Sequence, residues 1–123
     1  MIKVLIIEDN APVRRALTRM LRLTGHDVTE AGDGAEGLAQ FRAAPPDVVV
    51  TDMLMPNLDG GAVIRQLRAE APGARIIAVS GAFGVSPDGT PEPHEEADAI
   101  LHKPFLADEL IRLIAGLMER PAA

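Results

Sequence analysis

The feature that most constrains the fold is the short apolar run at residues 48–50 (VVV), inside the stretch DVVVTDMLMPNLDG at 47–60. Three consecutive β-branched residues between turn signals predict a strand that is buried on both faces, as in a parallel sheet. This strand ends near Asp52, just before a loop that contains Pro56 and Gly60. Most aspartates in such a position are turn or capping residues. A functional role for Asp52 therefore depends on what the other strands place beside it.

Strand and helix patterns alternate along the whole chain. Strands are predicted at about residues 3–7, 27–31, 48–50, 75–79 and 99–101. Helices are predicted between Asn10 and Gly25, between Gly34 and Pro45, and at about residues 61–71 and 107–118. Short strands joined by helical crossovers predict an α/β fold, in which a doubly wound five-stranded parallel sheet is covered by helices on both faces.

The segment 81–96 (GAFGVSPDGTPEPHEE) interrupts this alternation where a fourth helix is expected. It contains three glycines and three prolines within sixteen residues. Proline removes a backbone donor and glycine lowers helix propensity, so this sequence disfavours the interior of a helix. We therefore expect the fourth helix to be degraded into an irregular loop at about 81–96, and a loop of that length often has a function of its own.

Composition narrows the class of protein. A chain of 123 residues with 47% hydrophobic content fits one domain, spanning 1–123, with a single core. A net charge of -6 and an aromatic content of 2% argue against nucleic-acid binding, which uses basic patches and stacking side chains. The absence of cysteine excludes disulfides and thiolate chemistry. With no signal peptide and no apolar run of membrane-spanning length, we expect a cytoplasmic protein that does not enter a membrane.

Residues suited to binding a metal ion and a phosphoryl group follow the ends of four predicted strands. Glu8 and Asp9 follow the first strand, Asp52 the third, Ser80 the fourth and Lys103 the fifth. Because ligands bind at the carboxyl ends of parallel strands, we expect these five side chains to share one edge of the sheet. Crowded carboxylates repel one another, and Mg²⁺, which prefers oxygen ligands, would offset that repulsion. If Asp52 attacked a phosphoryl group, the Lys103 ammonium and the Ser80 hydroxyl would stabilise the developing charge.

Four motifs together resemble the receiver domain of two-component response regulators, and the resemblance covers the whole chain. The motifs are the pair Glu8-Asp9, Asp52 followed by MLMPNLDG, SGA at 80–82 and KPF at 103–105. The resemblance implies a flavodoxin-like sheet with the strand order 2-1-3-4-5. It also implies a cis peptide bond before Pro104.

The resemblance further implies a Mg²⁺-dependent transfer of a phosphoryl group to Asp52 from a histidine kinase or a phosphotransfer protein. Glu8 and Asp9 would hold Mg²⁺ directly or through water, together with Asp52 and the backbone carbonyl of Leu54. The hydroxyl and the ammonium that follow the fourth and fifth strands would bind the new phosphoryl oxygens. Such a protein is a signalling phosphoacceptor rather than an enzyme.

Several positions depart from the receiver pattern. Ile100 stands three residues before the lysine, where the family often has an aromatic residue whose rotamer follows the serine, so the sequence does not support aromatic switching. Leu54 and Ala82 are apolar at two positions that tune hydrolysis of the acyl phosphate in the family, and we expect slow hydrolysis. His94 and His102 lack the spacing of metal ligands, and we expect plain surface roles for both.

We therefore expect a stand-alone receiver that signals to an unknown downstream protein by direct contact. The expected output surface is the loop at 81–96 with the last helix, and a homodimer would form through residues 81–105 and that helix. Two alternatives remain open. One is a phosphorylation-independent interaction module with a vestigial acidic site, which a failure to react with acetyl phosphate would favour. The other is a hydrolase or nucleotide-binding domain, against which stands the absence of G-x-G-x-x-G and Walker motifs.

Overall fold

The structure is a computed structural model that describes residues 2–53, 60–80 and 97–119. The strands are β1 (Lys3–Ile7), β2 (Asp27–Ala31), β3 (Val48–Asp52), β4 (Arg75–Ser80) and β5 (Ala99–His102). The helices are α1 (Ala11–Leu23), α2 (Gly34–Ala43), α3 (Gly60–Glu70) and α4 (Ala107–Glu119). Each element predicted from the sequence is present, and its ends shift by only one or two residues.

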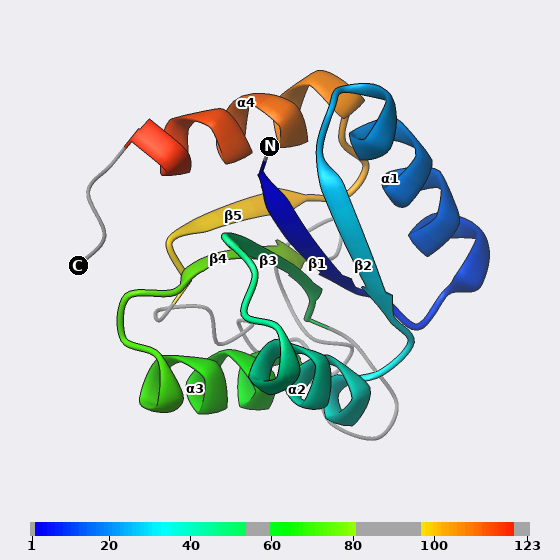
Figure 1. The fold of residues 1–123 in the computed structure, drawn as a ribbon. Helices are drawn as coiled ribbons and strands as arrows, with labels where there is room; N and C mark the ends of the chain where they lie inside the picture. Colours follow the sequence, from blue (N-terminus) through cyan, green and yellow to red (C-terminus); the bar gives the residue numbers. More distant parts are fainter. Residues whose placement is uncertain (1, 54–59, 81–96, 120–123) are drawn as a thin grey trace.

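All neighbouring strands are parallel, and their order across the sheet is β2-β1-β3-β4-β5. Figure 1 shows α1 and α4 on one face of this sheet and α2 and α3 on the other. The predicted doubly wound α/β architecture and the order 2-1-3-4-5 are therefore confirmed. In this topology the strands direct their carboxyl ends to one edge, where the ends of the paired strands β1 and β3 lie side by side.

The centre of the sheet is β3, which is buried along its whole length. Successive side chains of a strand point to opposite faces. Val49 joins Phe41 in the core beneath α2 and α3, whereas Val48 and Val50 join Ile114 in the core beneath α1 and α4. A run of apolar β-branched residues contributes to both cores at once, which explains why β3 is the central strand of the sheet.

Capping side chains begin the two helices that follow β1 and β2. The Asn10 side chain accepts a hydrogen bond from the Val13 backbone N–H at 3.1 Å, and the Asp33 side chain accepts one from the Glu36 N–H at 2.8 Å. Gly25 follows α1 with a φ of +92°, a conformation that other residues rarely adopt. The two caps fix the turns at the carboxyl edge of the sheet, whereas Gly25 lies in the turn that leads into β2 at the opposite edge.

The helix α2 approaches β1 closely at Gly37. A Cβ atom at this position would lie 2.7 Å from Cγ1 of the buried Ile7, well inside van der Waals contact. Only glycine therefore permits this packing without a shift. The approach bears on the site, because Ile7 directly precedes Glu8 at the end of β1.

The remaining expectations concern the loop at 81–96, the Leu54 carbonyl, the peptide bond before Pro104 and the membrane. The predicted irregular loop at 81–96 and the backbone carbonyl of Leu54 lie outside the described residues. The Lys103–Pro104 peptide bond is cis, as the resemblance implied. Among the described helices, none has the length and apolar character needed to span a membrane.

Candidate functional site

The five side chains predicted from the sequence lie at the carboxyl edge of the sheet. Glu8 and Asp9 follow β1 directly, Asp52 and Ser80 are the last residues of β3 and β4, and Lys103 follows β5. The parallel register pairs Asp52 with the residue before Ser80, so these two strands end almost level. The topology thus delivers each residue type to the edge at which ligands bind in sheets of this kind.

Three carboxylates converge at this edge. One oxygen atom from each of Glu8, Asp9 and Asp52 lies within 4.8 Å of the other two. Glu8 and Asp52 are buried, with 4% and 8% of their surface exposed, whereas Asp9 is exposed. Oxygen ligands at this separation suit a hard divalent cation. In the part of the chain that the structure describes, no other group of acidic, His or Cys side chains has metal-binding spacing.

Lys103 supplies a positive charge beside the buried carboxylates. Its Nζ lies 3.4 Å from Asp52 Oδ2 and 3.6 Å from Glu8 Oε1. An ammonium between two carboxylates offsets part of their mutual repulsion. The contact also places a cation where negative charge would build up if Asp52 acquired a phosphoryl group.

The surroundings of Glu8 raise its pKa from 4.5 to about 8. Burial is the largest cause, followed by a hydrogen bond with Asp52 and repulsion by its charge, while Lys103 acts in the opposite direction. The apolar side chains of Val13 and Phe105 line the same small hollow as the two carboxylates, which explains the burial. In the absence of a cation, burial and the neighbouring Asp52 therefore favour the protonated form of Glu8.

Ser80 is fully buried, and its Oγ lies 2.7 Å from Nδ1 of His102. The two residues stand directly opposite each other in the parallel pair of β4 and β5. The sequence predicted only a plain surface role for His102. The residue is exposed, but its bond to Ser80 shows that this interpretation was incomplete. The signal was missed because the predicted fifth strand ended at residue 101, one residue before the pairing with Ser80.

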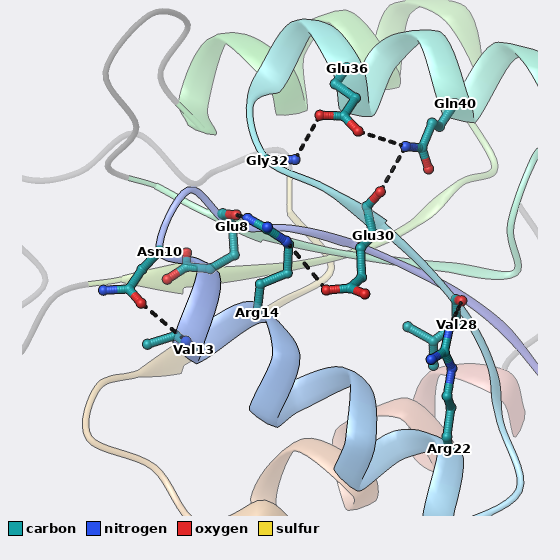
Figure 2. Close-up of polar contacts among 10 residues, drawn as sticks. All are labelled: Glu8, Asn10, Val13, Arg14, Arg22, Val28, Glu30, Gly32, Glu36 and Gln40. Carbon is teal, nitrogen blue, oxygen red and sulfur yellow. Dashed lines mark hydrogen bonds and ion pairs between the residues drawn. The ribbon is translucent and has the colours of Figure 1, made fainter.

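Arg14 was also missed from the sequence, and it holds the acidic turn in place (Figure 2). Its Nη1 donates a hydrogen bond to the Glu8 backbone carbonyl at 2.9 Å, and its Nε lies 3.3 Å from Glu30 Oε1. This side chain therefore ties α1 to the ends of β1 and β2. Nothing in the sequence distinguished Arg14 from the other arginines of α1, since the helix contains four of them.

A family model now accounts for this combination of fold and side chains. The model of the response regulator receiver domain matches residues 4–115. The chain belongs to this family. The match covers all four motifs from which the sequence suggested a receiver domain, including the pair Glu8-Asp9, Asp52 and Lys103, which the structure brings together.

The receiver is similar to curated proteins and to solved structures. It is 38% identical over 118 residues to the probable transcriptional regulator ycf27 of Porphyridium aerugineum, with 96% of the chain and 48% of the relative covered. It matches the receiver domain of the Francisella response regulator 1452 with a TM-score of 0.86, at 32% identity and 98% coverage of both chains. It matches the response regulator protein TrrA from Thermotoga maritima, in complex with Mg²⁺-BeF, with a TM-score of 0.84, at 27% identity and with 95% and 99% covered. The chain spans about half the length of the curated relatives that it matches.

Proposed function

We propose that this receiver accepts a phosphoryl group on Asp52 from a histidine kinase or a histidine phosphotransfer protein. The observation that carries the proposal is the environment of the Asp52 carboxylate. An ammonium lies 3.4 Å from it, and two further carboxylates lie within 4.8 Å, at the carboxyl edge of a parallel sheet. Membership of the receiver family supports the same role.

In the proposed reaction, one carboxylate oxygen of Asp52 attacks the phosphorus atom in line with the bond that breaks. A new O–P bond forms, and the P–N bond of the phosphohistidine donor breaks, with its electron pair passing to the imidazole nitrogen. Acetyl phosphate would react in the same way, with acetate as the leaving group. Water later cleaves the acyl phosphate, which releases inorganic phosphate and restores the carboxylate of Asp52.

The side chains beside Asp52 would stabilise the charge on the transferred group. The Lys103 ammonium is already 3.4 Å from Asp52 Oδ2, so it can pair with a phosphoryl oxygen after a small movement. Ser80 ends the neighbouring strand and would donate its hydroxyl proton to another of these oxygens. Ser80 is the last residue of β4 and Lys103 directly follows β5, so the sheet places both donors at the edge where Asp52 lies.

The acidic cluster fits Mg²⁺, because Glu8, Asp9 and Asp52 present three hard oxygen ligands within 4.8 Å of one another. We propose that these side chains hold the ion with the backbone carbonyl of Leu54, which lies outside the described residues. When bound, Mg²⁺ supplies positive charge that neutralises phosphoryl oxygens. The structure of TrrA in complex with Mg²⁺-BeF supports this assignment.

We also propose that the phosphorylated receiver acts in the cytoplasm by contact with a downstream protein or with a second copy of the chain. The surface suggested by the sequence is the segment 81–96 with α4 for a downstream protein, and residues 81–105 with α4 for a second copy. In its described part, Leu101, Arg112 and Leu113 line an open groove between β5 and α4. Slow hydrolysis of the acyl phosphate would make the domain a phosphoacceptor rather than an enzyme that turns over substrate.

Intact-mass spectrometry after incubation with acetyl phosphate and Mg²⁺ tests the proposal. We expect the wild-type protein to gain the mass of one phosphoryl group and Asp52→Asn to gain none. Asp27→Asn removes an exposed aspartate of β2 and should react like the wild type, so it serves as the matched control. A wild-type protein that stays unmodified with both acetyl phosphate and a phosphorylated histidine donor would refute phosphotransfer and favour a phosphorylation-independent interaction module.

A further inference from the structure

The contact between Ser80 and His102 joins the buried site to the surface of the domain. Ser80 is fully buried at the end of β4, whereas His102 is exposed at the end of β5. The distance of 2.7 Å between Ser80 Oγ and His102 Nδ1 is that of a short hydrogen bond. The two residues are register partners in neighbouring parallel strands, so the backbone of the sheet holds them opposite each other.

The sequence of β5 offers Ser80 no other polar side chain. Leu101 packs into the core beneath α4, so the residues on either side of it, Ile100 and His102, point to the opposite face. Val79 lies in the same core as Leu101, which places Ser80 on that opposite face as well. Ile100 has only a hydrocarbon side chain, whereas the imidazole of His102 can donate or accept a hydrogen bond.

A hydroxyl group has one proton to donate and two lone pairs that accept. When His102 Nδ1 carries no proton, the hydroxyl proton of Ser80 is directed at that nitrogen. The proposed function requires the same proton to be donated to a phosphoryl oxygen on Asp52. In this state of the ring, Ser80 can bind the phosphoryl group only if His102 releases the proton, either because the ring moves or because Nδ1 itself becomes the donor to Ser80 Oγ.

We propose that His102 is a positioning residue that holds the Ser80 hydroxyl in the resting receiver and releases it when Asp52 is phosphorylated. This inference rests on the proposed function of Asp52. The release changes the hydrogen bonding of an exposed imidazole, so the state of the buried site is transmitted to the end of β5. His102 thereby supplies a connection between serine and surface that Ile100 cannot make.

Nitrogen NMR of isotope-labelled histidine rings tests the release directly. Spectra are recorded in Mg²⁺ with and without beryllofluoride as the phosphoryl mimic, and His102→Asn assigns the signal among the three histidines. We expect Nδ1 of His102 to change from a hydrogen-bond acceptor to a free or protonated nitrogen, while the ring of His26 stays constant. A constant His102 ring, with a shifted Asp52 amide, would overturn this inference and leave the proposed function intact. An Asp52 amide that ignores the mimic would refute both.

A double-mutant cycle of His102→Leu and Ser80→Ala separates positioning from a merely structural contact. Removing the hydrogen bond from the Ser80 hydroxyl to His102 favours the mimic-bound state, so His102→Leu should tighten beryllofluoride binding by roughly three- to tenfold, the effect of one hydrogen bond. In the Ser80→Ala background, the same substitution should leave the affinity unchanged. His102→Asn keeps a polar atom near the place of Nδ1 and should bring the affinity back toward that of the wild type. Equal effects in both backgrounds, or weaker binding by His102→Leu alone, would contradict the positioning role.

Discussion

Glu8 makes the stability of the metal-free receiver depend on pH, and the direction follows from its raised pKa. Its pKa is raised from 4.5 to about 8, so between these values the folded protein binds a proton that the unfolded chain has lost. The resulting stabilisation is complete below the unfolded pKa of 4.5 and disappears as the pH rises through about 8. The free energy of unfolding, measured by urea denaturation without metal, should therefore fall across this window. Glu8→Gln cannot ionise and should flatten the slope, whereas a slope that persists would assign the proton to another group.

Asp9 allows metal binding to be tested apart from folding, because its side chain is exposed. An ion that binds only the folded state stabilises it by about 1.4 kcal/mol when its concentration is about ten times the dissociation constant. We expect millimolar Mg²⁺ to raise the Tm of the wild type and Asp9→Asn to lose most of this gain. Asp27→Asn, at the start of β2, should keep it. A wild-type Tm that does not respond to millimolar Mg²⁺ would count heavily against the metal site.

The residues at the sheet edge could be predicted from the sequence, whereas their interactions could not. Asp52 and Lys103 are recognisable because a strand pattern ends beside each of them. The raised pKa of Glu8 depends on burial by side chains from α1 and from the segment after β5, which no local pattern reveals. The bond between Ser80 and His102 depends on the register of two strands that are 22 positions apart in sequence at these residues.

At the scale of elements, two glycines test how tightly the helices pack. A Cβ at Gly37 of α2 would meet Cγ1 of Ile7 at 2.7 Å, whereas a Cβ at Gly116 of α4 would have nothing within 4 Å. Gly116→Ala should stabilise the domain by roughly 0.5–1 kcal/mol, because alanine has the higher helix propensity. Gly37→Ala should destabilise it by roughly 1–3 kcal/mol, because either α2 or the Ile7 side chain must shift.

Urea denaturation of the two glycine variants, with matched conditions, measures this difference. Ile7→Val removes the terminal methyl group that faces α2, so adding it to Gly37→Ala should recover part of the loss. The same substitution added to Gly116→Ala should bring no recovery, since a Cβ at Gly116 would have nothing within 4 Å and so does not meet Ile7. Equal gains from alanine at both glycines would show that α2 does not depend on the close approach to β1.

The existence of each element was predictable because its signals are local. β3 is an uninterrupted apolar run, and α1 and α2 begin at Asn10 and Asp33, whose side chains cap them. The end of β5 was less predictable, because pairing with β4 extends the strand to His102 although the apolar pattern stops at residue 101. A strand at the edge of a sheet takes its length from its neighbour as much as from its own sequence.

At the scale of the whole molecule, the alternation of strands and helices predicted a parallel sheet but not the order of its strands. Right-handed crossovers allow several orders for five strands. The order 2-1-3-4-5 came from the resemblance to receiver domains, and the register of β1 with both β2 and β3 confirms it. This order matters to function, because it brings the ends of β1 and β3 together and so assembles the acidic cluster.

A change at the site can reach the rest of the molecule through Ser80. This residue is bonded to His102 in β5 and is followed in the chain by Gly81, so its displacement would act on β5 and on the start of segment 81–96 together. From the glycines and prolines of that segment, the sequence predicts an irregular loop, which we expect to gain or lose order when Asp52 is phosphorylated. Amide hydrogen exchange with and without beryllofluoride should therefore change more in 81–96 than in α1 and α2.

The variant Asp52→Asn provides the control for the exchange experiment, because the mimic should then alter neither the loop nor β5. His102→Leu tests the route: if the signal passes along the backbone after Ser80, the loop should still respond in this variant, and if it needs the imidazole, the response should shrink. Exchange in 81–96 that is as slow as in β3 with and without the mimic would remove this segment as the output surface. Exchange in 81–96 that does not change with the mimic, while exchange on other surfaces does, would also exclude this segment. The output surface would then lie on the faces whose exchange changed.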